Sequence, residues 1–170
     1  MELQWMGQYR EIVRALIRYA NLYAHFQTDK RGDGIDVPLT AHEWQTLECI
    51  CEFEDNMYNM AYLAKRIGIP ASNFSKYVKT LTSLGLVERY RLAGNKKNII
   101  LKLSPKGKEL YLKRSQLILT EWAPIFATLE GIPPEELNQF TDFIVKFGDI
   151  MDSSVQSAPI LHKIEPQNNC

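Results

Sequence analysis

The sequence predicts a mainly α-helical fold that carries one small β hairpin. Most apolar residues recur at the three- and four-residue spacing of amphipathic helices, whereas two short stretches near residue 95 are β-branched and apolar and flank a polar tip. The chain has 170 residues, of which 45% are hydrophobic. A chain of this length buries one good core, so we expect one domain with helical extensions.

The first helix is expected over residues 2–26. Its apolar and aromatic positions follow the 3, 4 spacing of a heptad seam, at Met6, Tyr9, Val13, Leu16, Ala20 and Tyr23. Such a seam fits a helix that packs on its own core, and it equally fits a helix that pairs with a helix of another chain. Three turns of pattern do not separate these two interpretations.

A second helix is predicted over residues 40–53, after a loop that contains glycine and proline. Thr40 and Glu43 have the spacing of a capping box, in which the hydroxyl accepts a hydrogen bond from the N3 amide and the carboxylate accepts one in return. Apolar residues at helical spacing follow, at Trp44, Leu47 and Ile50. This combination marks the start of a helix.

Two shorter helices come next. Asn59 is placed to cap a helix that stops at Gly68, and Pro70 suits the first turn of a helix that ends at Gly85. Two short helices joined by a tight turn with a glycine form a helix-turn-helix.

The predicted hairpin completes the pattern. Residues 86–92 and 98–103 are expected to be strands, with residues 93–97 as the polar tip between them. Helix, helix, strand, basic tip and strand together make a winged helix-turn-helix. We place this lobe at about residues 40–104.

Long helices are expected after the hairpin. One starts at Ser104 and Pro105, and the last starts at Pro133, so that together they span about residues 105–152. The expected single domain therefore covers residues 1–152. Residues 153–170, rich in Ser, Gln, Pro and Asn, read as a flexible tail.

Positive charge is concentrated in residues 59–114, although the whole chain is formally neutral. This segment holds thirteen lysines and arginines and two acids, so its net charge is +11 and the rest carries −11. Such a concentration is the electrostatic footprint of a protein that neutralises phosphates. A solvated helix surface also carries lysines, but an even scatter would not leave so few acids. The charge favours double-stranded DNA as the partner.

The helix after the turn carries the side chains best suited to read bases. Its apolar stripe is opposed by a polar face of Ser72, Asn73, Ser75, Lys76 and Lys79. Asn73 has an amide that can pair with adenine, and Lys76 can reach guanine. We expect these two to read bases and the other three to lie nearer the phosphates, because the N-terminal half of a recognition helix meets the base edges. The alternative is a plain solvent face.

Several motifs resemble those of a known family in order and separation. They are Leu39-Thr40, Leu63-Ala64, Ser72-Asn-Phe-Ser-Lys76, Leu81 with Leu84-Gly-Leu-Val-Glu-Arg89, and Leu103-Ser-Pro-Lys-Gly107. On these motifs, residues 2 to 151 resemble the MarR family of winged-helix transcription regulators. The resemblance implies a homodimer formed by the first and last helices, whose lobes bind a pseudo-palindromic operator. It also implies repression that is relieved by a small, often aromatic, ligand.

The wing departs from the family pattern. Members commonly carry Asp-x-Arg at the tip, where this chain has Asn95, Lys96 and Lys97. Lysine is a hydrated point charge and suits a narrow minor groove less well than arginine, so we expect this wing to hold phosphates more than to read groove width. Arg91, on the preceding strand, is a candidate substitute for the missing arginine.

Two lysines raise a separate question. Lys106 and Lys108 fall in the first turn of a predicted helix, where the helix dipole disfavours cations. An anionic partner would compensate, and an exposed site that feels little of the dipole explains the pattern equally well.

An effector site follows only from the resemblance. In the family, ligands lie between the dimer helices and the DNA-binding lobe, which here would draw on Tyr23, His25, Trp44, Trp122 and Phe126. These aromatic residues are equally well explained as core.

No catalytic or metal-binding pattern is found in the sequence. His25, His42 and His162 stand in different segments without the spacing of metal ligands, and there is no glycine-rich phosphate loop or nucleophile elbow. Cys49 and Cys51 face different directions on a helix and are expected in or near the core. We therefore expect no enzyme activity, no cofactor and no metal.

Two other classes of function fit parts of the pattern. A winged helix can serve as a protein-interaction module without specific DNA binding, but that role predicts an apolar or mixed recognition face. A dimerisation domain of an enzyme would need a cofactor-binding domain downstream. No apolar run is long enough to span a bilayer and no signal peptide is evident, so we expect a cytoplasmic protein without membrane contact.

Overall fold

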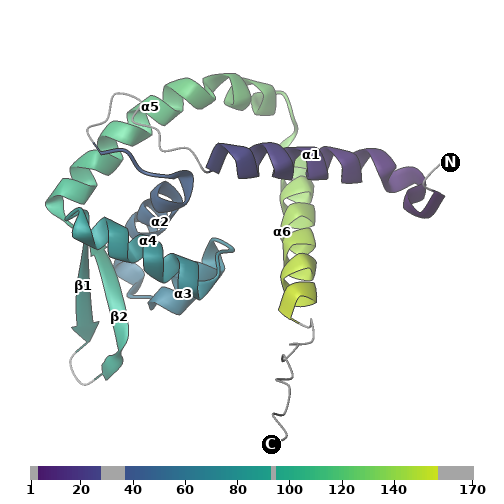
Figure 1. Ribbon diagram of the computed structural model, residues 1–170. Coiled ribbons are helices and arrows are strands. Elements are labelled where there is room, and N and C mark those ends of the chain that lie inside the picture. Colours follow the sequence, from purple (N-terminus) through teal and green to yellow (C-terminus); the bar gives the residue numbers. More distant parts are fainter. Residues whose placement is uncertain (1–3, 28–36, 93–94, 157–170) are drawn as a thin grey trace, which may run out of the picture. The chain divides into compact units, whose positions relative to one another are not determined.

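The computed structural model describes residues 4–27, 37–92 and 95–156, which divide into two compact units with the boundary after Ile118 (Figure 1). The first unit contains η1 (Gln4–Tyr9), α1 (Arg10–Gln27), α2 (Ala41–Glu52), η2 (Glu54–Asn56), α3 (Met60–Arg66), α4 (Ala71–Ser83), β1 (Val87–Leu92), β2 (Asn95–Leu103) and the start of α5 (Pro105–Glu130). The second unit contains the rest of α5 and α6 (Pro134–Gln156). The predicted mainly helical fold with a winged helix-turn-helix is confirmed.

The predicted helix caps form as expected. Thr40 Oγ1 accepts a hydrogen bond from the Glu43 amide at 3.3 Å, and Glu43 Oε2 accepts one from the Thr40 amide at 2.8 Å. Asn59 Oδ1 accepts from the Tyr62 amide at 2.9 Å at the start of α3. Both caps satisfy amides that a helix leaves without an internal partner, which is why these positions were readable from sequence.

The turn between α3 and α4 relies on one glycine. Gly68 has φ of +67°, a conformation that costs other residues energy because of their Cβ atom. The chain closes behind it with a hydrogen bond from the Ile69 amide to Ala64 O at 3.0 Å. This turn brings α4 onto α2 and α3, where Phe74, Val78 and Leu81 are fully buried.

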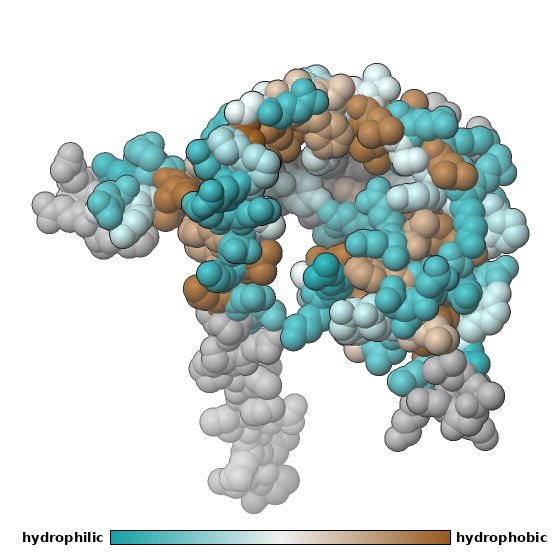
Figure 2. All heavy atoms as spheres, turned by 180° about the vertical axis from the view of Figure 1, so that it is seen from behind, coloured by the Kyte–Doolittle hydropathy of each residue, from teal (hydrophilic) through white to brown (hydrophobic). Residues whose placement is uncertain are grey.

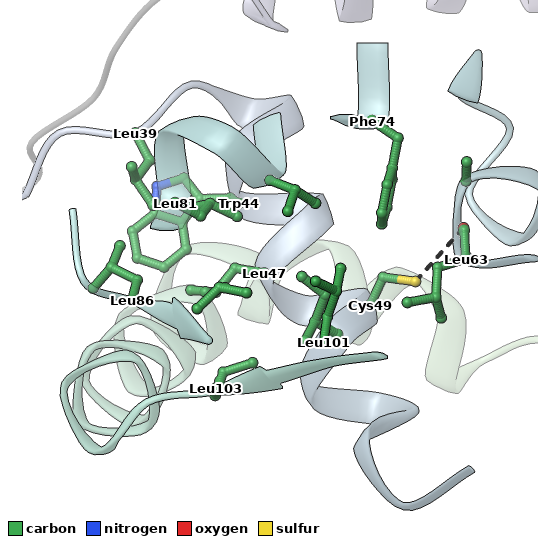
Figure 3. Close-up of a cluster of buried hydrophobic side chains, with 14 of the residues drawn as sticks. Leu39, Trp44, Leu47, Cys49, Leu63, Phe74, Leu81, Leu86, Leu101 and Leu103 are labelled. Carbon is green, nitrogen blue, oxygen red and sulfur yellow. Dashed lines mark hydrogen bonds between the residues drawn. The ribbon is translucent and has the colours of Figure 1, made fainter. Parts of the chain in front are cut away.

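One hydrophobic core holds the lobe together (Figure 3). Leu47 of α2, Phe74 of α4 and Leu101 of β2 point into it from three elements, so the core fixes the recognition helix against the hairpin. Cys49 lies at its edge and donates its thiol hydrogen to Leu63 O at 3.8 Å. Burial raises the pKa of the Cys49 thiol to about 11, so this cysteine is a packing residue, as expected.

The wing is an antiparallel hairpin with a longer second strand than predicted. Val87 pairs with Leu103, and the register continues to Arg91 and Ile99. It then shifts, because Leu92 pairs with Asn95. The expected five-residue tip at 93–97 is therefore wrong: strand pairing resumes at Asn95, and an irregularity in the ladder accommodates the extra residues.

The first helix also differs from the expectation. Residues 4–9 form the 3-10 segment η1, in which Gly7 has φ of +49° and ψ of −137°. The 3, 4 seam therefore continues in α-helical geometry only from Val13 to Tyr23. Because the side chains of a 3-10 helix repeat every three residues, Tyr9 does not continue that stripe, and it is 63% exposed.

A tight joint links the end of α4 to the start of α5. Ser104 Oγ donates to Gly85 O at 2.6 Å and accepts from the Gly107 amide at 3.0 Å, which caps α5. The Ser104 amide donates to Leu86 O at 2.9 Å. Gly107 lies directly against that Leu86 carbonyl, where a Cβ atom would stand only 2.1 Å from the oxygen.

Among the helices of the described residues, none is long and apolar enough to cross a membrane.

Candidate nucleic-acid interface

The polar face of α4 is exposed as predicted. Ser72, Ser75, Lys76 and Lys79 are exposed and Asn73 is half-buried. The opposite side of the helix is locked by the fully buried Phe74, Val78 and Leu81. The core therefore determines which side of α4 faces outward, and it is the side that carries amide, hydroxyl and ammonium groups.

The N-terminal end of α4 favours an anion. Pro70 stands at the cap position and has no side-chain oxygen that could cap the helix, and no side-chain cap forms there. Its carbonyl accepts from the Asn73 and Phe74 amides at 2.9 and 3.0 Å, while the helix dipole places partial positive charge at this end. Backbone amides at such a terminus are suited to a phosphate group.

Neither of the two α4 lysines takes part in an ion pair formed within the described part of the chain. Ser75 differs, because its hydroxyl donates to Ala71 O at 2.9 Å within the helix. A hydroxyl in this position can still accept a hydrogen bond from outside, but its own hydrogen is engaged.

Within the described part of the structure, five cations of the basic segment contact partners in the same chain. These contacts are Arg66 over the Phe53 ring (5.6 Å), Lys106 Nζ to Leu84 O (3.0 Å), Lys108 Nζ to Glu54 Oε2 (3.1 Å), Lys113 Nζ to Glu109 Oε1 (2.8 Å) and Arg114 over the Trp44 ring (5.5 Å). Fewer cationic side chains are therefore free to turn toward a partner than the sequence alone suggests, and the exposed ones include Lys76 and Lys79 of α4 and Arg89 and Arg91 of β1.

The two lysines in the first turn of α5 both have partners within the chain. Lys106 donates to the carbonyl of Leu84, the residue that ends α4, and Lys108 pairs with Glu54. Each cation finds a carbonyl or a carboxylate inside the molecule, so no external anion is required at the start of α5.

The wing presents arginines on one face of β1. Arg91 is exposed, and Arg89, two residues earlier, points to the same face and is also exposed. Arg89 was not among the predicted site residues, although the two-residue period of a strand indicates it once Arg91 is chosen. Asn95, Lys96 and Lys97 form the start of β2, and their side chains lie outside the described part of the structure.

The other face of β1 carries an acid. Tyr90 donates its hydroxyl hydrogen to Glu88, and this bond, together with the negative charge of Glu88, raises the pKa of Tyr90. Along β1 itself the side chains on the two faces therefore differ in charge, and Arg89 and Arg91 are the ones suited to phosphates.

The residues predicted for an effector site fall into two groups. In the first unit, Trp44 is buried in the core, Tyr23 accepts a hydrogen bond from Gln45 Nε2, and His25 lies exposed in the last turn of α1. In the second unit, Trp122 and Phe126 pack together with ring centroids 6.3 Å apart and are both more than 40% exposed. For Trp44 the core interpretation fits, and an effector site stays a prediction.

Of the two remaining histidines, His42 lies in the described part of the chain and contacts an aromatic ring. His42 stacks on Tyr77 of α4, with ring centroids 5.4 Å apart and nearly parallel planes, and His162 lies outside the described residues. Within residues 4–27, 37–92 and 95–156 there is no group of three or more potential metal ligands.

Comparison with known proteins agrees with this geometry. Residues 36–97 match the model of the MarR family. The HTH-type transcriptional regulator PchR of Bacillus subtilis (strain 168) is 20% identical over 133 residues, which cover 78% of each chain. The structure is similar to that of Streptococcus pneumoniae FabT in complex with DNA, with a TM-score of 0.60, 16% identity and coverage of 86% of this chain and 99% of that one.

A third similar protein is Staphylococcus aureus MarR, whose structure was determined in complex with salicylate and kanamycin. The TM-score is 0.59 at 16% identity, with coverage of 91% of this chain and 97% of that one. The matched segment 36–97 contains the helix-turn-helix and the beginning of the wing, so the part of the chain that carries the proposed interface is also the part that carries the family pattern. Residues 36–97 therefore match the MarR family, and the fold is similar to that of MarR-type regulators of known structure.

Proposed function

We propose that the protein is a ligand-responsive repressor that binds a pseudo-palindromic operator as a homodimer. The observation that carries this proposal is the face of α4, where Asn73 and Lys76 point away from a fully buried stripe at the N-terminal half of the helix. Recognition helices meet base edges with that half, and amide and ammonium groups match the acceptors and donors of the major groove. Lys79, Arg89 and Arg91, which are all exposed, would hold the phosphates. A regulator of this kind acts in the cytoplasm and needs no catalytic group.

The dimer part of the proposal rests on apolar surface. Large hydrophobic side chains are exposed along α1 at Ile12, Ile17, Tyr19 and Leu22 and along α6 at Phe140, Phe143, Val145, Phe147, Ile150 and Met151. Figure 2 shows hydrophobic side chains at the surface of the long helices. Exposed apolar surface on this scale marks an interface, and in a homodimer each copy covers the other.

The mass in solution tests the dimer. Light scattering should give about 39 kDa, twice the 19.6 kDa of the chain. A monomer at micromolar concentration would contradict both the dimer and the two-half-site operator.

Salt dependence tests DNA binding. Affinity for a random duplex should fall steeply as salt rises, because each phosphate contact releases a counterion. The Lys113→Met variant is a matched control, since that lysine is paired with Glu109 and should leave the slope unchanged. Binding that is absent at low salt would contradict the proposal and would favour the protein-interaction module, although the polar face of α4 argues against that role.

Two observations support the proposal that a small aromatic ligand regulates DNA binding. The structure of the Staphylococcus aureus relative holds salicylate, an aromatic carboxylate, and Trp122 and Phe126 expose aromatic surface on α5. If this chain responds in the same way, salicylate should release a labelled duplex, and Trp122→Ala should weaken that response without changing DNA affinity in its absence. Release that is equal in both proteins would remove Trp122 from the site.

A further inference from the structure

Three consecutive carbonyl groups at the end of α4 accept hydrogen bonds from the start of α5. Leu84 O accepts from Lys106 Nζ at 3.0 Å, and Gly85 O accepts from Ser104 Oγ at 2.6 Å. Leu86 O accepts from the Ser104 amide at 2.9 Å. The end of a helix leaves carbonyls such as that of Leu84 without internal partners, and these bonds link the residues at and after the end of α4 to the start of α5.

We propose that Lys106 is a positioning residue that holds the recognition helix α4 at a fixed angle on α5. The inference rests on the proposed function, because the angle matters only if α4 enters the major groove. Lys106 is suited to this task because its ammonium group stands at the C-terminal end of α4, where the helix dipole is negative. This contact also accounts for a cation in the first turn of α5, a location that the dipole of α5 itself disfavours.

Lys106 contacts the C-terminal end of α4, whereas the base-reading side chains lie near its N-terminal end. Asn73 lies in α4 eleven residues before Leu84, the C-cap of that helix, which corresponds to roughly 16 Å at the rise of an α-helix. A rotation of about 5° at the C-terminal end therefore displaces the base-reading side chains by roughly 1.4 Å. A displacement of that size stretches a normal hydrogen bond beyond its useful length.

Two contacts beside Lys106 already hold the main chain between α4 and α5, so Lys106 is not needed for the fold itself. Ser104 and the close approach of Gly107 to Leu86 hold the main chain of the joint, at residues that directly follow the end of α4. Lys106 bonds the carbonyl of Leu84, the C-cap residue that directly follows Ser83, the last residue of α4. Loss of its ammonium group should therefore leave the fold intact and loosen the direction of α4.

Loss of the Lys106 contact should affect DNA binding differently from loss of a lysine that contacts a phosphate. A dimer must place two recognition helices in successive major grooves, so a loosened helix must be ordered again on binding a two-half-site operator. A lysine that contacts a phosphate instead contributes about one unit to the slope of log affinity against log salt, on any sequence.

The experiment compares full-length Lys106→Met, Lys106→Arg, Lys79→Met and Lys113→Met with the wild type. Each is titrated on a duplex selected from a random pool with the wild-type protein, on the same duplex with one half-site scrambled, and on a random duplex at several salt concentrations. Hydrogen exchange of the Gly85 and Leu86 amides is recorded in parallel, since these amides bond to Thr82 O and Leu81 O at the end of α4.

For Lys106→Met we expect a threefold to tenfold loss of affinity on the intact selected duplex, about the effect of one hydrogen bond. We expect a smaller loss on the scrambled duplex, an unchanged salt slope and faster exchange of the two amides. Lys106→Arg should restore both affinity and exchange, because its guanidinium also donates to a carbonyl. Lys113→Met removes the same charge from the same helix and should change none of these quantities.

A salt slope that falls by about one in Lys106→Met, as expected for Lys79→Met, would overturn the inference and make Lys106 a phosphate contact. Unchanged affinity and unchanged exchange would also overturn it. Both results can be distinguished from a failure of the proposed function. In that case the wild-type protein itself would bind no duplex, and the inference would fail with it.

Discussion

Replacement of Gly107 by alanine tests whether the joint between the hairpin and α5 requires a residue without a side chain. The new Cβ atom would stand 2.1 Å from the Leu86 oxygen and 3.0 Å from the Leu86 carbonyl carbon. A carbon and an oxygen in contact normally stay at least about 3.3 Å apart, so one backbone must move by roughly 1.2 Å. Neither backbone moves freely, because Leu86 O accepts from the Ser104 amide and the Gly107 amide donates to Ser104 Oγ.

The expected cost combines two terms. Overpacking against backbone costs about 1 to 3 kcal/mol, and weakening of a buried hydrogen bond adds about 1 kcal/mol. We therefore expect a loss of about 3 kcal/mol in the free energy of unfolding. For a chain of this size, that loss should lower the melting temperature by roughly 6 to 12 °C.

The assay is chemical and thermal unfolding followed by circular dichroism, at one fixed protein concentration because the proposed dimer couples stability to concentration. Gly131→Ala is the matched control, since Gly131 has nothing within 4 Å of a new Cβ atom and no positive φ. A loss below about 1 kcal/mol in Gly107→Ala, or equal losses in the two variants, would refute the packing argument.

Three other predictions follow from the interface and the core. Asn73→Ala or Lys76→Ala should cost about 1 to 3 kcal/mol on a selected operator and much less on random DNA in equilibrium binding, whereas equal losses would show that these residues contact the backbone. Replacement of both Lys96 and Lys97 by alanine should lower the salt slope by about 2, because each lysine is expected to neutralise one phosphate, and an unchanged slope would mean that the wing does not touch DNA. Burial raises the pKa of Glu48, and the attraction of Arg114 opposes this shift. The folded state therefore binds the proton of Glu48 more tightly than the unfolded state does. As a result, the free energy of unfolding falls as pH rises from the ordinary glutamate pKa through the raised one. Glu48→Gln should therefore be more stable than the wild type at pH 7 and should flatten this pH dependence in urea unfolding, and a variant that is less stable at pH 7 would contradict this account.

Most of the helices and strands, and their order, could be predicted from local sequence patterns. The Thr40 and Asn59 caps, the glycine turn at Gly68 and the start of α5 at Pro105 depend on hydrogen bonds and steric limits within about four residues. The buried stripe of α4 follows from helical periodicity, which in turn assigns the polar face. Local rules of this kind can be read without knowledge of the fold, and the resemblance to the MarR family rests on the same residues.

The contacts that engage some cationic side chains within the chain could not be predicted from the sequence, because they join residues far apart along it. Lys106 meets Leu84 across 22 residues of sequence and Lys108 meets Glu54 across 54, and neither pairing has a local signature. The same holds for Gly107, whose lack of a side chain matters because the chain folds back onto Leu86. The strand that resumes at Asn95 also depends on pairing with Leu92 across the hairpin. A net charge calculated from the sequence counts every cation alike. Folding brings distant carbonyls and carboxylates to some of these cations. It thereby distinguishes the cations that are engaged within the lobe from those that are free to contact DNA.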